Sequence, residues 1–406
     1  MRLKISLKPI QPLNVTILLC LFLAALNFIT RYYYFIFIAF GLFCLMHKGR
    51  IKIVTTACIP LIILAISWVV FAPGLTASIF NFLKPFAYLI CYIMGYNMMQ
   101  IDMQKQELNY KKFFLLLCVV AAGTLVHYLL NWTTNLNAFN SRNTIDIWTG
   151  AVMAATGQAS LACLPLALSI AGIFSSNNRN IKVLSFGVLA VVVGYNLILS
   201  GRTLFILIAA VAVLAFLHRL VREQSGKMKT VFSLALIIAV VVLAYHFNLF
   251  GIRTAVENSL FYDRFFGDRA IELDEDGRMD KKLYHLRHML QYPFGGVNIR
   301  EQIGYAHDIY LDTYDEAGIF ALLSLLFYIA QAIGSLWKCV SNKCIPFAVR
   351  QTVLCLYVLV LIEFMVEPIL QGMPWFFASF CFIDGCVRRI VQQQTKRLES
   401  THYENC

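Results

Sequence analysis

Long apolar stretches recur along almost the entire chain, and short polar segments separate them. A helix that crosses a bilayer needs about 20 predominantly apolar residues, which is close to the length of these stretches. The pattern predicts about twelve membrane-spanning helices, with a tolerance of roughly one or two because some stretches are short or crowded together. They lie near residues 13–30, 32–46, 53–71, 84–100, 113–130, 155–174, 183–200, 203–218, 230–250, 308–336, 346–366 and 374–388.

Composition agrees with this pattern. The 406 residues are 59% hydrophobic and only 14% charged, with a mean hydropathy of +0.69. A soluble domain of this length has no need for so much apolar surface. The first apolar stretch lacks a small-residue cleavage site, so we expect a retained span and not a signal peptide. We therefore predict an all-α polytopic membrane protein in which residues 1–406 form a single membrane domain.

One long polar segment, residues 251–307, interrupts the apolar pattern and predicts a large extracytoplasmic loop. Residues 281–290 within it have the pattern of an amphipathic helix, with leucines on one face and basic residues opposite. The leucines are Leu283, Leu286 and Leu290, and the basic residues are Lys281, His285 and His288. We expect this helix to lie at the bilayer interface. The sequence leaves two roles open for this helix: it either contacts a ligand or only forms the floor of the loop.

The positive charges predict the orientation. With the N-terminus inside, 22 of the 34 lysines and arginines fall on the inner side, and four fall in short outer turns: Arg31, Lys84, Arg142 and Arg202. Positive residues concentrate in cytoplasmic loops. We therefore expect both termini in the cytoplasm and the long loop outside the cytoplasmic membrane. The formal net charge of +12 is explained mostly by topology, and no basic–aromatic platform indicates nucleic-acid binding.

Outer positive charges are scarce, so three of them are candidate binding residues. Arg202 lies in the turn Ser200-Gly-Arg202 between two apolar stretches. It either extends to lipid headgroups or clamps a phosphate, for which the planar guanidinium is suited. Lys84 and Arg142 present the same two alternatives.

Polar and aromatic residues gather where the chain returns to the membrane after the long loop. His307, Tyr310 and Tyr314 recur at helical spacing. Beside them runs a stripe of carboxylates: Asp308, Asp312 and Asp315. Aromatic faces and carboxylates are typical of sugar-binding grooves. A histidine at a helix start is either a structural cap or a catalytic base, because its ordinary pKa is close to neutral.

Two further carboxylates, Glu363 and Glu367, lie one helical turn apart near the outer end of their span. They are candidate partners for the outer arginines or members of a structural ion pair. The acidic run 272–276 lacks the spacing of a calcium loop, and the twelve cysteines form no CxxC pair. We expect neither a metal ion nor a cofactor.

Several motifs together resemble the O-antigen ligase/polymerase superfamily. They are Arg278, the turn Tyr292-Pro-Phe-Gly-Gly296, the string His307-Asp-Ile-Tyr-Leu311 and the following Glu316-Ala-Gly-Ile319. The outer-turn arginine of Ser200-Gly-Arg202 and the large loop before the tenth span match as well. The specific motifs cover about 120 residues. One position departs from the family pattern, because Asp308 stands where the family usually has asparagine.

The resemblance implies a GT-C-like, metal-independent glycosyltransferase in a bacterial inner membrane. Its donor would be an undecaprenyl-pyrophosphate-linked glycan, held at the pyrophosphate by Arg202 and Arg278. His307 would act as general base for the acceptor hydroxyl. Lys84, Arg142, Asp308, Tyr310 and Tyr314 remain candidate substrate-binding residues. This chemistry requires little beyond stabilising negative charge and removing one proton.

Three activities compete. A polymerase transfers the growing chain to a lipid-linked repeat unit, and a chain-length regulator is then an expected partner. An O-antigen ligase transfers the finished polymer to lipid A–core. Only 10 residues separate Gly296 from His307, a compact segment that favours the polymerase. A polysaccharide or solute transporter is a third reading, but the charge gathers at the outer surface and no repeated halves stand out.

Overall fold

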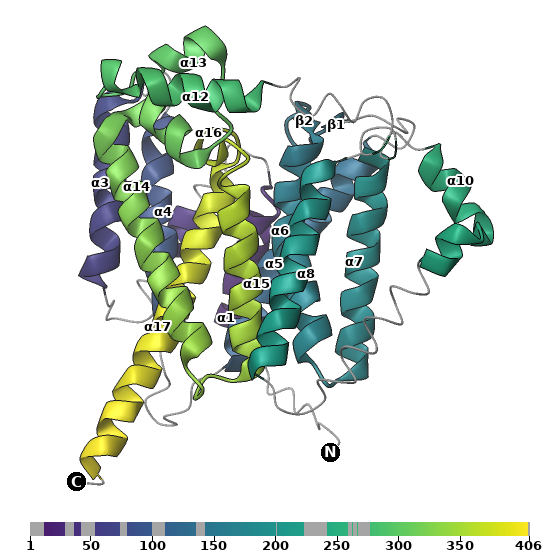
Figure 1. The fold of residues 1–406 in the computed structure, drawn as a ribbon. Helices are drawn as coiled ribbons and strands as arrows, with labels where there is room; N and C mark the ends of the chain where they lie inside the picture. The colour runs from purple at the N-terminus through teal and green to yellow at the C-terminus, as the bar shows by residue number, and fades with distance from the viewer. Residues whose placement is uncertain are drawn as a thin grey trace.

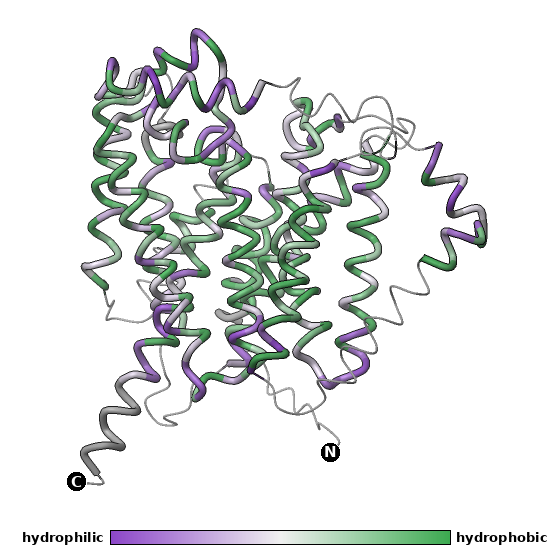
Figure 2. Tube along the Cα trace, in the orientation of Figure 1, coloured by the Kyte–Doolittle hydropathy of each residue, from purple (hydrophilic) through white to green (hydrophobic). Residues whose placement is uncertain are grey.

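A computed structural model describes residues 12–28, 36–41, 53–73, 79–99, 110–134, 143–199, 201–222, 242–258, 262, 266 and 277–404. Long helices run side by side and form one bundle (Figure 1). Hydrophobic residues fill the middle of these helices, and hydrophilic residues gather towards their ends (Figure 2). This distribution is what a bilayer imposes on a helical protein.

The helices of the bundle coincide with most of the predicted spans. They are α1 (Pro12–Ala25), α3 (Thr55–Phe71), α4 (Ile79–Met98), α5 (Tyr110–Thr133), α6 (Ala155–Ser175), α7 (Arg179–Leu199), α8 (Arg202–Arg222), α14 (Ile309–Ser341), α15 (Phe347–Glu363) and α17 (Pro374–Glu404). In the described part of the chain, five of them are long and apolar enough to cross a membrane: α5, α6, α7, α8 and α14. The mainly helical membrane architecture is thus confirmed. The predicted total of twelve spans stays a prediction.

A large aromatic core holds the bundle together where α14, α15 and α17 meet. The ring of Phe364 lies 5.4 Å from Phe380 and 5.7 Å from Phe377. Tyr328 of α14 makes edge contacts with the same two phenylalanines. Edge-to-face aromatic contacts add to the stabilisation from burial, so these helices form a firm base for the loops at their ends.

Short helices cover one end of the bundle, which we call the α12 end. They are α12 (Arg278–His288), the 3₁₀ turn η4 (Met289–Gln291), α13 (Asn298–Ile303) and α16 (Ile369–Gly372). Figure 1 shows α12 lying across the ends of the long helices. The chain also forms η2 (Leu249–Gly251) and α10 (Ile252–Glu257) earlier in the predicted loop.

The amphipathic helix predicted at 281–290 exists, but it begins at Arg278 and ends at His288, so Leu290 falls in η4. Its polar face also has a different role. Leu283, Leu286 and Leu290 are 41%, 51% and 81% exposed, which leaves the apolar face open. His285, in contrast, is buried, and its Nε2 lies 3.0 Å from the Gly304 carbonyl oxygen. The basic face therefore packs against the protein because its histidine finds a backbone partner there.

The all-α prediction missed one element. Strands β1 (Asn143–Ile145) and β2 (Val152–Ala154) form a short antiparallel hairpin between α5 and α6. Asp146 starts its turn by accepting hydrogen bonds from the Trp148 and Thr149 amides at 3.0 and 2.9 Å. Such local side-chain bonds favour turns, and only three residues on each strand are needed to close the hairpin.

Candidate functional site

The Pro-Phe-Gly-Gly turn crosses α14 at very close range. A Cβ atom at Gly295 would lie 2.7 Å from the Gly318 nitrogen, and one at Gly318 would lie 2.7 Å from Phe294 Cα. Both glycines have positive φ, at 78° each. The Gly318 kink in α14 also lets the Ile319 amide donate to the Pro293 carbonyl at 2.8 Å. The two motifs are therefore the halves of one backbone crossing that fixes the chain just before His307.

His307 occupies a left-handed conformation two residues before α14 begins. Its φ is 55°, which is uncommon for a residue with a side chain. The Asp312 carboxyl holds this conformation from inside the helix. One of its oxygens accepts the Ala306 amide at 2.8 Å, and the other accepts the Asp308 amide at 3.0 Å.

Asp312 is 2% exposed, so it holds the amides of the two residues that flank His307 in a water-poor environment. Non-glycine residues keep such a conformation only when their surroundings impose it, and they concentrate at functional sites. The expected common helical face of His307, Tyr310 and Tyr314 is wrong at its first member, because the helix starts only at Ile309. His307 is half-buried at the edge of the α12 end.

Asp308 is the N-cap of α14. Its Oδ1 accepts the amides of Tyr310 and Leu311 at 3.0 and 3.3 Å. Aspartate and asparagine cap helices about equally well. The additional negative charge faces Lys282, whose Nζ lies 3.4 Å from Asp308 Oδ2 and 2.6 Å from the Met365 carbonyl oxygen. The departure from the family pattern is thus accompanied by a basic partner.

Arg278 begins α12 and points toward the end of α15. Its Nη1 lies 3.3 Å from the Val366 carbonyl oxygen and 3.6 Å from Glu367 Oε1. Glu367 is therefore the carboxylate of the two that lies beside Arg278, which fits both of the expected alternatives. Glu363 is fully buried and accepts a hydrogen bond from the Ser160 hydroxyl of α6.

Residues 364–367 connect the two halves of the site. The Ile309 amide donates to the Phe364 carbonyl at 2.8 Å, and Lys282 and Arg278 contact the next two carbonyls. The start of α12, the His307 loop and the end of α15 are thus tied to a single short segment. This brings together Arg278 and the His307–Asp308 pair.

Glu367 is buried, and its pKa is shifted from the ordinary value of a glutamate. Burial raises its pKa above the ordinary value, although the Arg278 guanidinium and a hydrogen bond with Thr156 act to lower it. The carboxyl therefore gives up its proton less readily than a surface glutamate, and the positive charge of Arg278 is only partly balanced by it.

The first turn of α6 lies between the two candidate arginine segments. Thr156 bonds Glu367, which faces Arg278. On the other side, a Cβ atom added at Gly201 would lie 3.4 Å from Ala155, next to the half-buried Arg202. The N-cap of α6, Ala154, provides no side-chain cap. A helix N-terminus carries roughly half a positive charge and free amide donors, which favour an anion.

The remaining predicted residues lie elsewhere. Lys84 is buried, with its ammonium 5.1 Å from the centre of the Trp68 ring. Tyr310 is half-buried and packs on the core.

Tyr314 is 1% exposed, and its hydroxyl donates to the Met289 carbonyl. This tyrosine holds η4 against α14 and presents no face to a sugar in this structure. Arg142 lies outside the described residues, as does the acidic run at 272–276.

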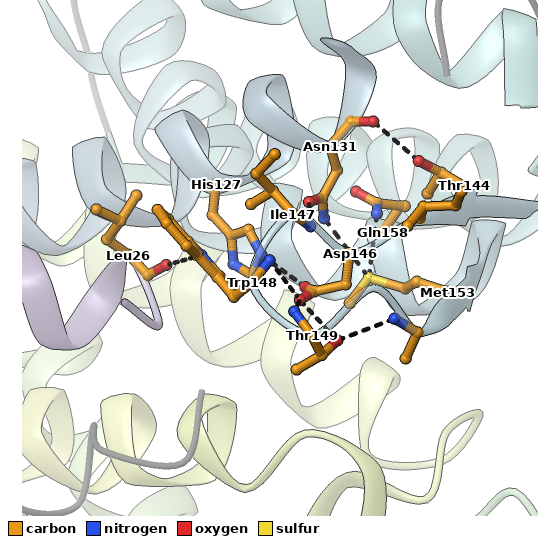
Figure 3. A network of polar contacts seen from close by, with 12 residues as sticks. Leu26, His127, Asn131, Thr144, Asp146, Ile147, Trp148, Thr149, Met153 and Gln158 are labelled. Carbon is orange, nitrogen blue, oxygen red and sulfur yellow. Dashed lines mark hydrogen bonds and ion pairs between the residues drawn. The ribbon is translucent and has the colours of Figure 1, made fainter. Parts of the chain in front are cut away.

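The hairpin that follows α5 carries a second buried polar network (Figure 3). The His127 Nε2 lies 2.8 Å from Asp146 Oδ2, and both residues are almost fully buried. Burial alone raises the pKa of Asp146, but the hydrogen bonds from His127 and Thr149 outweigh it and bring the pKa below its ordinary value. The adjacent Trp148 donates through Nε1 to the Leu26 carbonyl at 3.1 Å. These contacts fix the hairpin to α1 and α5.

Sequence reasoning missed Lys282, Ser160 and Thr156, and it gave Asp312 no role beyond the acidic stripe. Lys282 sits beside the predicted amphipathic face, and the hydroxyl residues lie in an apolar span. The spacing of Asp312 five residues after His307 was visible, but its contact with two loop amides depends on the left-handed turn. Among the described residues, no group of three or more His, Cys, Asp or Glu side chains is placed to hold a metal ion.

Neither a scan against models of protein families nor a search of curated proteins finds a match to this chain. The motifs in the sequence and the geometry at the α12 end are therefore the features that indicate a function.

Proposed function

We propose that the chain is a membrane glycosyltransferase that extends a lipid-linked glycan on the outer face of a bacterial inner membrane. The donor is an undecaprenyl-pyrophosphate-linked glycan, and the acceptor is a lipid-linked repeat unit. The observation that carries the proposal is the His307 loop, which Asp312 holds in a left-handed conformation beside the segment that contacts Arg278.

A diphosphate leaving group requires positive charge where its own charge develops. Arg278, Arg202 and the uncapped first turn of α6 supply it from three different elements. Arginine binds phosphate oxygens through two parallel N–H donors, which also fixes orientation.

His307 supplies the proton acceptor in this proposal. The neutral imidazole removes a proton from a sugar hydroxyl as that oxygen attacks the anomeric carbon of the donor. The bond between the anomeric carbon and the pyrophosphate oxygen breaks, and undecaprenyl pyrophosphate leaves. Asp312 does not touch the substrate; it is a positioning residue that fixes the backbone on both sides of His307.

The exposed leucines of α12 fit the lipid nature of the donor. Leu283 and Leu286 lie on the helix that begins with Arg278, Leu290 lies in the turn η4 that follows it, and all three remain open to the surroundings. If they contact the outer leaflet, a diphosphate at headgroup depth meets Arg278 directly. Burying a fully exposed leucine in lipid contributes about 1.5–3 kcal/mol, and each of these partly exposed leucines gains a corresponding fraction.

Glycan profiling of a strain that lacks the gene tests the proposal. For a polymerase, we expect lipid A–core that carries single repeat units and no long chains. Wild-type protein should restore the ladder of chain lengths, whereas His307→Ala and Arg278→Gln should not. Full-length polymer that accumulates on the carrier lipid would instead identify a ligase. An unchanged glycan profile in the deletion strain would reject both activities.

A further inference from the structure

A cavity of about 340 Å³ lies at the end of the bundle opposite to α12. Its lining includes Val54 and Thr56 at the start of α3, Gln331 and Lys338 of α14, and Arg388 of α17. α3 runs from this cavity to Phe71, whose ring stacks on Phe294 beside the glycine crossing. The cavity is thus separated from the proposed site by the length of a helix, and by the charge pattern it lies at the cytoplasmic end.

Arg388 is the central group of the cavity wall. Its Nε lies 2.8 Å from Asp384 Oδ2, and its Nη1 lies 2.9 Å from the Gln331 side-chain oxygen. Asp384 is itself fully buried and also accepts hydrogen bonds from Tyr328 and Tyr357. Buried charges inside a membrane helix bundle are costly and indicate function in most cases.

One nitrogen of this guanidinium is left over. Arg388 is 8% exposed, and its Nη2 is buried without a hydrogen-bond partner. A buried N–H that lacks an acceptor destabilises the protein, and it does so more strongly when the group is charged. Asp384 and Gln331 already occupy the other two nitrogens, and the side chain lines the cavity, so an acceptor bound there would satisfy the remaining one.

Two more features of the cavity attract the same kind of ligand. α3 begins here with Val54 as N-cap, which provides no side-chain hydrogen bond to the first amides of a 17-residue helix. The exposed Lys338 stands at the rim and adds a second positive charge. Ser335 and Gln392 contribute further polar side chains to the lining. A guanidinium, an ammonium and a helix N-terminus that converge on one space are typical of phosphate recognition.

We propose that this cavity binds a phosphate group, with Arg388, Lys338 and the start of α3 as its ligands. The phosphate belongs to an anionic lipid headgroup or is free in the cytoplasm, and the recognition chemistry is the same for both. The site is independent of glycan transfer at the α12 end, so its failure would not affect the function proposed above.

A substitution at Gly334 tests the site without touching its charged residues. Gly334 lines the cavity in the last third of α14, and a Cβ added there meets no atom within 4 Å. Gly334→Leu therefore fills the cavity and favours the helix. Gly187→Leu is the matched control, since Gly187 is an exposed glycine of α7 with equally open surroundings. Lys338→Gln is the second variant, and its exposed side chain makes misfolding a minor concern.

The full-length proteins are purified in detergent and assayed with two probes. Native mass spectrometry measures retention of phosphatidylglycerol against phosphatidylcholine, and calorimetry measures binding of inorganic phosphate. We expect wild type and Gly187→Leu to bind equally, Gly334→Leu to lose binding at least tenfold, and Lys338→Gln to weaken it severalfold. Retention of phosphatidylglycerol alone identifies a headgroup site, and binding of inorganic phosphate identifies a free-phosphate site. If wild type binds neither probe, or if Gly334→Leu binds as well as wild type, the proposal is overturned.

Discussion

Replacing Asp312 by asparagine should disable the His307 loop while leaving the bundle folded. The wild-type carboxyl accepts the Ala306 and Asp308 amides through its two oxygens. An asparagine offers one carbonyl oxygen and one NH₂ group, so one of the two amides loses its acceptor and faces a donor. The left-handed conformation of His307 is then held by one contact less.

The magnitude follows from the lost contact. A buried amide without an acceptor costs about 1–3 kcal/mol, which lowers the equilibrium constant for the held conformation roughly 5- to 150-fold. A left-handed conformation already costs a non-glycine residue about 1–2 kcal/mol, so the loop has reason to relax. We expect glycan transfer per folded molecule to fall about tenfold or more.

Asp315→Asn is the matched control. Asp315 is also buried in α14 and also accepts two amides, those of Ile299 and Arg300 at 3.0 and 3.3 Å, but these open α13 and do not flank His307. The assay is the glycan ladder of a complemented deletion strain, normalised to the amount of monodisperse protein. Wild-type activity per folded molecule in Asp312→Asn, or an equal loss in Asp315→Asn, would refute the positioning role.

Three other substitutions test separate parts of the account. Gly318→Ala should lower the yield of folded protein and its melting temperature, because the new Cβ meets Phe294 Cα at 2.7 Å and φ is +78°; a wild-type melting curve would show that the crossing tolerates a side chain. Asp308→Asn should keep the cap of α14 and retain activity within a fewfold, and a complete loss of activity would mean that its charge is required. Burial raises the pKa of Glu367 in the folded state, so the folded protein favours the protonated carboxyl. This preference contributes to the free energy of unfolding in acid, and the contribution is lost as pH rises through the raised pKa. Glu367→Gln should therefore melt like wild type in acid and above wild type toward neutral pH, in thermal scans between about pH 4 and 8; equal melting of the two proteins at every pH would contradict the raised pKa.

The apolar pattern predicted the long helices well, because a span is specified by composition alone. Helix α6 was expected at 155–174 and begins and ends within a residue of that range. Gly295 and Gly296 of the Tyr292–Gly296 motif also indicated a turn. The reason for it, a crossing between Gly295 and Gly318, was not visible because the contact joins residues far apart in sequence.

The finer features of the site depend on tertiary contacts that spacing cannot supply. Helical periodicity placed His285 on a solvent-facing side, but the residue is buried because the Gly304 carbonyl offers a partner. Helical periodicity likewise predicted that His307 belongs to the helix. The helix begins only at Ile309, because the Asp312 carboxyl holds the backbone before it in a turn. Lys282 was overlooked because its partner, Asp308, approaches from a different helix.

Transfer by the purified protein tests the central claim most directly. Wild type and His307→Ala are placed in lipid nanodiscs with undecaprenyl-pyrophosphate-linked repeat units, and mass spectrometry follows extended glycan and released undecaprenyl pyrophosphate. We predict that wild type forms both products and that His307→Ala forms them at least about 100-fold more slowly, the contribution expected of a general base. A His307→Ala protein that forms both products at the wild-type rate would contradict the assignment of His307 as the base.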